Sequence, residues 1–231
     1  MTVAEEAGET GPIGRPSVLA RLQRGLERLY RVKTDLAVDA FLVDETERAR
    51  VGVARAPREQ MLVDQSDADE LRLGLFVEGR ALSNLEQNDP AHTLGDANFA
   101  DFCIAVEGVS HFVYLATCAA GDRSVTALEL ELQAEVDKFV CCVLRVPTPP
   151  GPRDVSALRR QLYDDVSFAP DLDDLERERY VLANAQARRY TSGLATRFLA
   201  ADRVADMLPE LRRFYRLDLG HKLGHISRMA G

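Results

Sequence analysis

The sequence predicts an α+β protein, in which an N-terminal helix and a small antiparallel β-meander pack on a C-terminal antiparallel helical bundle. Three observations lead to this fold class. Residues 17–30 carry apolar side chains at helical spacing, residues 71–78 alternate in the manner of a half-buried strand, and residues 97–219 return to helical patterns. A lone hairpin is marginally stable, so the sheet is expected to pack on the helices, and residues 16–82 and 97–231 are expected to form one cooperative unit.

The N-terminal part begins with an acidic, Gly- and Pro-containing stretch, residues 1–15, which we expect to be a disordered tail. It lacks the basic and apolar regions of a signal peptide. Ser17 is the expected N-cap of the first helix. A β-hairpin is predicted over residues 59–78, and the apolar runs at 36–43 and 50–55 extend it to a meander of three or four strands.

The C-terminal part follows a connecting loop predicted over residues 83–96. Gly121 and the Thr126–Glu129 capping box mark the turn between the two helices of an antiparallel hairpin. The proline-rich run "PTPPGP" ends this hairpin, because proline cannot continue a helix. The predicted helices are 97–119, 124–146, 154–166, 171–200 and 206–219.

Composition narrows the class of protein. The 231 residues include 46% apolar and 29% charged side chains, as in ordinary globular proteins. The net charge of −8 argues against nucleic-acid binding, which relies on basic side chains, and no uninterrupted apolar run reaches the roughly 20 residues of a membrane span. The four cysteines lack CxxC spacing, so we expect reduced thiols and a cytoplasmic protein. The excess of Arg over Lys is typical of GC-rich bacterial genomes.

The candidate site begins in the run "AVEGVSHFVYLA", where polar side chains interrupt an otherwise apolar helix. On a helical wheel the polar residues form one stripe, which Glu131 and Glu135 of the next helix can approach; the stripe is Glu107, His111, Tyr114 and Cys118. Two interpretations remain open. Glu107, His111 and Glu135 could hold a divalent metal or perform acid–base chemistry, or the stripe could be a buried polar network that fixes helix register. The sequence favours the structural network.

Two further sets of residues are weaker candidates. His221 and His225 stand four residues apart and could chelate a metal if helical, but Gly220 and Gly224 favour an exposed C-terminal turn. The side chains of Arg177 and Arg188 share a helix face and could clamp an anion, although pairing with nearby carboxylates is commoner.

Sequence motifs of common enzyme classes are absent: there is no GxGxxG, Walker A, GxSxG or HExxH pattern. We therefore expect a bacterial cytoplasmic accessory protein that acts through a protein partner or as a homo-oligomer, without an evident cofactor. The alternative is a metal-dependent enzyme or sensor with its Glu/His site between the helices of the 97–146 hairpin.

Overall fold

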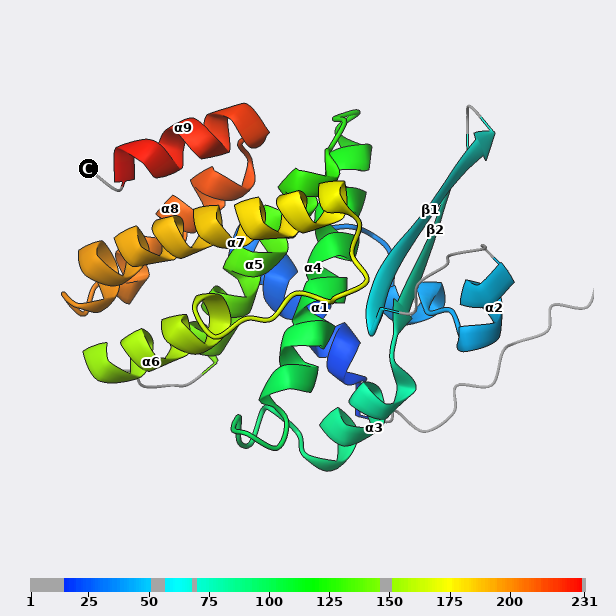
Figure 1. The fold of residues 1–231 in the computed structure, drawn as a ribbon, viewed down its shortest axis with the longest axis horizontal. Helices are drawn as coiled ribbons and strands as arrows, with labels where there is room; N and C mark the ends of the chain where they lie inside the picture. Colours follow the sequence, from blue (N-terminus) through cyan, green and yellow to red (C-terminus); the bar gives the residue numbers. More distant parts are fainter. Residues whose placement is uncertain (1–14, 51–56, 68–69, 146–150, 230–231) are drawn as a thin grey trace, which may run out of the picture.

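The computed structural model of this protein describes residues 15–50, 57–67, 70–145 and 151–229. Most of the predicted tail, most of the strand predicted at 50–55 and most of the proline-rich run lie outside the described residues. Within the described part the predicted fold class is confirmed (Figure 1). Its helices and strands are α1 (Val18–Tyr30), α2 (Glu45–Arg50), β1 (Glu59–Asp67), β2 (Glu70–Val77), α3 (Gly79–Gln87), α4 (Phe99–Ala120), α5 (Ala127–Leu144), α6 (Pro152–Tyr163), α7 (Asp174–Leu194), α8 (Val204–Tyr215) and α9 (Leu219–Met229).

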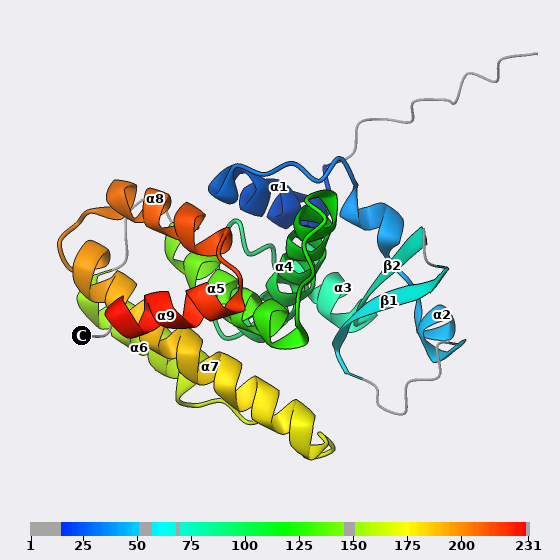
Figure 2. The same cartoon turned by 90° about the horizontal axis from the view of Figure 1, so that it is seen from above.

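Helix α4 is the central element, because other elements pack around it. Its neighbours are α1, α3, α5 and both strands of the hairpin (Figures 1 and 2). In the described part it is the one helix long and apolar enough to cross a membrane, with a mean hydropathy of 1.5, but 67% of that apolar window is buried inside the protein. Packing on all sides explains why the helix is apolar almost all round.

The ends of the helices carry the expected caps. The Ser17 hydroxyl accepts a hydrogen bond from the backbone N–H of Ala20 at 2.9 Å, and α1 ends at Arg31 in a left-handed conformation. The Thr126 hydroxyl accepts from the N–H of Glu129 at 3.2 Å and starts α5. These hydrogen bonds satisfy backbone donors that the helix itself leaves unpaired.

The sheet is smaller than predicted, since it has two strands among the described residues. β1 and β2 pair antiparallel, with Met61 opposite Leu75. The strand predicted at 36–43 is wrong: its centre is a 3₁₀ turn, Val38–Phe41. The Gln23 side chain on α1 accepts from the Val38 N–H at 2.9 Å and donates to the Leu36 carbonyl at 2.6 Å, so it occupies backbone groups that a strand would need for pairing.

Three segments outside the sheet also differ from the prediction. The loop predicted at 83–96 begins later, because α3 continues to Gln87 with Ala81 and Leu85 buried. The helix predicted at 171–200 is α-helical over Asp174–Leu194, and a π-helical turn follows it over Ala195–Leu199. The predicted exposed C-terminal turn is wrong, because α9 is a helix with a buried face.

Candidate functional site

His111 of α4 lies between two glutamates from other elements. Its Nδ1 is 3.2 Å from Oε1 of Glu59, the first residue of β1, and its Nε2 is 3.6 Å from Oε2 of Glu131 on α5. All three side chains are buried, with exposed fractions of 7, 9 and 11%. The Nδ1 contact is a hydrogen bond, whereas Nε2 has no hydrogen-bond partner among the described residues. One ring nitrogen is therefore hydrogen-bonded to Glu59, and the other is buried beside the Glu131 carboxylate.

A cavity of about 250 Å³ adjoins the imidazole. The hairpin contributes Glu59 and Gln60 to its wall, α5 contributes Glu131, and α7 closes the other side with Arg179 and Tyr180. The Arg179 guanidinium is within 3.8 Å of Glu131 and 5.3 Å of the Tyr180 ring centre. The cavity wall thus carries several polar side chains beside His111, and polar groups of this kind orient ligands in small-molecule sites.

Gly108 allows Glu59 to reach this site. It lies three residues before His111 on α4, and a Cβ placed there would be 3.0 Å from Cγ of Glu59 and 3.0 Å from Cδ1 of Leu75. The missing side chain lets the hairpin approach the helix closely enough for the Glu59 carboxylate to contact the imidazole.

The two carboxylates raise the pKa of His111. Burial alone lowers this pKa, because it disfavours the charged ring, but the Glu59 carboxylate beside Nδ1 and the Glu131 carboxylate beside Nε2 outweigh burial and hold the pKa well above 6.5. Burial in turn raises the pKa of the Glu59 carboxyl above its usual value. The two carboxylates therefore stabilise the charged form of the imidazole that lines the cavity.

Glu107 and Glu135 meet at Lys138 rather than at His111. The Lys138 ammonium is 3.1 Å from the Glu107 carboxylate and 2.8 Å from that of Glu135. Although burial opposes it, the Lys138 charge holds the pKa of Glu107 below its usual value, whereas burial raises the pKa of Glu135. In the described part of the chain no group of three or more His, Cys, Asp or Glu side chains is arranged to hold a metal ion.

The remainder of the predicted stripe, Tyr114 and Cys118, belongs to a second buried network. The Tyr114 hydroxyl donates to Glu129 at 2.5 Å and accepts from the ammonium of Lys222 on α9 at 2.8 Å. Arg123 donates to the Cys118 sulfur at 2.7 Å and to the Tyr114 oxygen at 2.8 Å. This part of the stripe joins α4 to α9 and is internal.

Asp137 lies at the other end of this second network. Lys222 donates to Gln133 Oε1 at 2.7 Å, and Gln133 donates to Asp137 at 3.0 Å. Ser110 on α4 and Tyr30 on α1 also donate hydrogen bonds to the Asp137 carboxylate. The network therefore ties together α1, α4, α5 and α9.

The weaker candidate residues lie apart from one another. His221 is exposed and contacts Asp218 at 2.7 Å, whereas His225 is buried and contacts Glu210 at 2.5 Å. Arg177 donates to the backbone carbonyl of Ala169 at 3.2 Å. Arg188 pairs with Asp164 at 2.7 Å, so the two arginines have separate partners.

The residues that sequence reasoning missed are Glu59, Lys222, Gln133 and Asp137. Gly108 was a usable signal for Glu59, because a glycine inside an apolar helix often marks a close approach of another backbone. Gln133 and Asp137 stand four residues apart beside the apolar stripe of α5, a spacing that places them on one helix face. Comparison with protein-family models, curated proteins and solved structures finds no match to this chain.

Proposed function

We propose that this protein is an enzyme that transfers a proton to a small polar ligand bound in the His111 cavity. The observation that carries the proposal is the asymmetric environment of the imidazole: Glu59 bonds Nδ1, Nε2 lies 3.6 Å from the Glu131 carboxylate, and the ring and Glu131 both line a cavity. A carboxylate that orients one nitrogen of a histidine is a recurring arrangement in general acid–base catalysis.

The proposed roles follow from the charges. His111 and Glu131 act together as the general acid: the Nε2–H bond breaks as its proton passes to the Glu131 carboxylate, and Glu131 passes a proton to a basic atom of the ligand. The ring remains as neutral imidazole with its Nδ1–H held by Glu59. Glu131 stabilises the imidazolium before the transfer. Arg179 and Tyr180, on the opposite wall, would orient the ligand.

The test follows the consumption of metabolites. Purified protein is incubated with a mixed small-metabolite extract, and depletion is recorded by mass spectrometry. We expect His111→Gln to reduce the rate by about 10²–10⁴-fold, the usual contribution of a positioned general acid. His221→Gln, which removes an exposed histidine outside the cavity, should retain the wild-type rate. Equal rates in wild type and His111→Gln would reject the proposal.

A second candidate is an interaction protein, as the sequence led us to expect. The observation in its favour is the exposure of apolar side chains on α7, where Leu175 is 76% and Leu182 is 37% exposed. These two residues stand seven apart and share a helix face. If this face mediates self-association, light scattering should give a dimer or larger species for wild type and a monomer for Leu175→Ser/Leu182→Ser. A wild-type monomer at every concentration would exclude self-association.

A further inference from the structure

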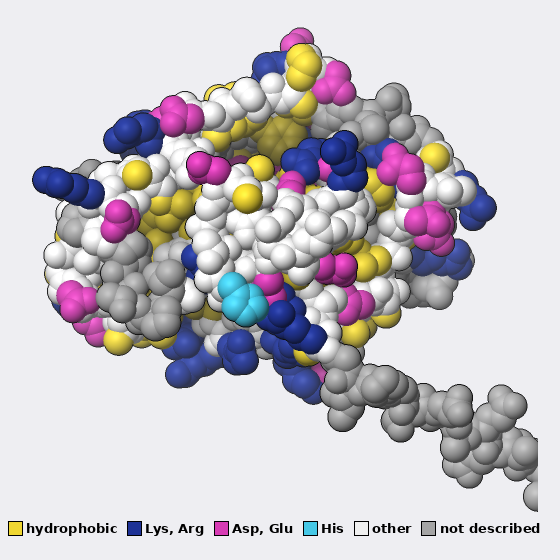
Figure 3. Space-filling view, turned by 90° about the horizontal axis from the view of Figure 1, so that it is seen from below, with side chains coloured by type: hydrophobic (Ala, Val, Ile, Leu, Met, Phe, Trp, Pro, Cys, Tyr) yellow, Lys and Arg dark blue, Asp and Glu magenta, His cyan; other side chains and the backbone are white. Residues whose placement is uncertain are grey.

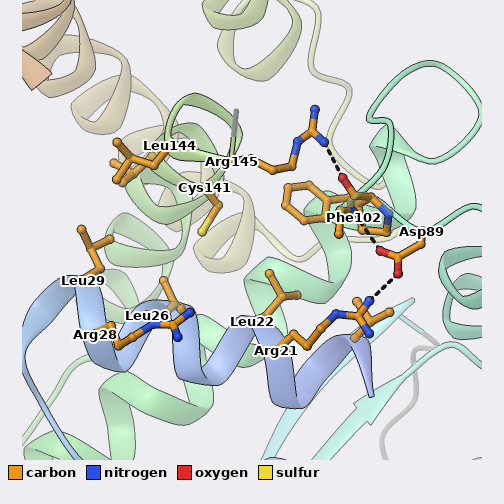
Figure 4. Close-up of a pocket in the computed structure, with 15 residues that line it drawn as sticks. Arg21, Leu22, Leu26, Arg28, Leu29, Asp89, Phe102, Cys141, Leu144 and Arg145 are labelled. Carbon is orange, nitrogen blue, oxygen red and sulfur yellow. Dashed lines mark hydrogen bonds and ion pairs between the residues drawn. The ribbon is translucent and has the colours of Figure 1, made fainter. Parts of the chain in front are cut away.

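A second cavity lies on a different part of the molecule. It has a volume of about 320 Å³ and lies between α1, the start of α4, the end of α5 and the loop at residues 89–91 (Figure 4). None of its lining residues also lines the His111 cavity. The two sites can therefore be tested independently.

The walls of this cavity are mainly apolar. Leu22, Leu26 and Leu29 project from α1, and Phe102 and Leu144 project from α4 and α5 (Figure 4). Gly25 lies among the α1 residues, and a Cβ placed there would have no atom within 4 Å. This glycine leaves space for a ligand where a larger side chain would fill it.

Three guanidinium groups surround these apolar walls. Arg21 and Arg145 are engaged, Arg21 with Asp89 at 2.9 Å and Arg145 with the Pro90 carbonyl. Arg28 makes no hydrogen bond or ion pair with the residues that the structure describes, and Figure 4 draws none for it. Nε of Arg145 is buried and likewise lacks a hydrogen-bond partner in the described part of the chain.

The local charge is positive although the whole chain is acidic. Asp89 is the one acidic residue among the described residues that line the cavity, and it is shared by Arg15 and Arg21. Lys and Arg side chains also gather along the lower edge of Figure 3. This edge corresponds to the upper edge of Figure 2, where α1 and α8 lie. An apolar cavity with an unpaired guanidinium, that of Arg28, in its lining is complementary to a molecule with a hydrocarbon chain and an anionic head.

We propose that this cavity binds a small aliphatic monocarboxylate, with its hydrocarbon chain among the leucines and its carboxylate paired with Arg28. Guanidinium and carboxylate match geometrically and can form two parallel hydrogen bonds. The cavity volume lies at the lower end of the range for small-molecule sites, roughly 300–1,000 Å³.

Isothermal titration calorimetry with three probes tests both halves of the proposed ligand. Octanoate has the chain and the carboxylate, octylamine has the same chain with a positive head, and acetate has the carboxylate without the chain. We expect octanoate to bind at least about tenfold more tightly than either of the other two, since both burial and charge pairing are then satisfied.

Two variants and a matched control locate the binding. Gly25→Leu should abolish octanoate binding by filling the cavity, and Arg28→Glu should weaken it by about tenfold or more by reversing the charge. Arg24→Glu makes the same charge change on the same helix at a residue that does not line the cavity, so it should change the Kd by less than about threefold. Thermal melting of each variant verifies that it folds.

Several results would overturn the proposal. Undetectable octanoate binding, or equal binding of octanoate and octylamine, would exclude an aliphatic monocarboxylate as the ligand. Unchanged binding in Gly25→Leu would place octanoate elsewhere, and equal weakening in Arg24→Glu and Arg28→Glu would indicate general attraction to a basic surface.

Discussion

Two buried cations in this protein have opposite pKa shifts, because their neighbours differ. The His111 imidazole lies between two carboxylates, which raise its pKa despite burial. The Lys222 ammonium is fully buried among the Tyr114 hydroxyl, the Gln133 amide oxygen and the rings of Tyr114 and Phe214. Burial dominates there and lowers the pKa of Lys222 to about 7, although Glu129 and Asp137 act in the opposite direction.

Lys222 should therefore make stability depend on pH. Its folded-state pKa of about 7 lies below its usual value of 10.5, so between these pH values the unfolded chain binds one proton more than the folded chain. The free energy of unfolding should rise with pH across this interval, by at most about 1.4 kcal/mol per pH unit from this group.

Urea denaturation at several pH values measures this dependence. Lys222→Met should flatten the rise between pH 7 and 10.5, because methionine has no proton to exchange. Lys33→Met, at a lysine whose side chain is 79% exposed, should leave the wild-type slope. The same slope in Lys222→Met and wild type would contradict the shifted pKa.

The Glu59–His111 pair gives a second prediction at the residue scale. Glu59→Gln removes the carboxylate from Nδ1 and should lower the pKa of His111 by about one unit or more, whereas Glu178→Gln, at an exposed residue of α7, should not. NMR titration of the ring ¹⁵N resonances measures this pKa. In the wild type, the contribution of the charged His111 to the free energy of unfolding is complete below about pH 6.5. It is lost as pH rises through the folded-state pKa of His111. An unchanged pKa of His111 in Glu59→Gln would show that Glu59 does not stabilise the charged imidazole.

At the scale of elements, the contact between α4 and the hairpin depends on Gly108. Gly108→Ala would place a methyl group 3.0 Å from Glu59 and Leu75, so the hairpin must shift, and we expect a loss of about 1–3 kcal/mol in the free energy of unfolding. Gly25→Ala is the matched control, because its methyl group meets no atom and should stabilise α1 by about 0.5–1 kcal/mol. Urea denaturation compares them, and Gly108→Ala at or above wild-type stability would refute the close contact.

Local patterns predict some elements well and others poorly. α1, α4, α5 and the hairpin have caps or periodicities of their own, and these could be predicted from the sequence. α9 has two glycines and little periodicity, and its helix depends on distant contacts: Lys222 is bonded to α4 and α5, and Met229 packs against Gly193 of α7. Tertiary packing supplies most helix stability in such a segment.

The candidate site was partly predictable for the same reason. The stripe from Glu107 to Cys118 follows from helical geometry alone, so its existence could be predicted. The helix rotation that sends Glu107 to Lys138 and His111 to Glu131 depends on how α4 and α5 pack. Glu59 is 52 residues away along the chain, and no local pattern specifies that contact.

At the scale of the whole molecule, one hydrophobic cluster runs from Val18 on α1 to Met229 on α9 and includes Leu75 of the hairpin. We therefore expect a single unfolding transition for the full chain, in keeping with the predicted cooperative unit. Far-UV circular dichroism reports the helices, and tyrosine fluorescence reports the six tyrosines, of which Tyr30, Tyr114, Tyr163, Tyr190 and Tyr215 are buried. The two melting curves should coincide, and a separate early transition in either would mean that part of the chain unfolds independently.

The position of Lys222 has a consequence for synthesis on the ribosome. Its partner Tyr114 is 108 residues earlier in the chain, so at roughly 5–20 residues per second the two are made on the order of 5–20 s apart. Throughout that interval the nascent chain carries the hydroxyl of Tyr114, and for the last 89 residues also the amide of Gln133, without the cation that they bind in the finished protein. The bundle can complete this part of its interior only after α9 has been synthesised.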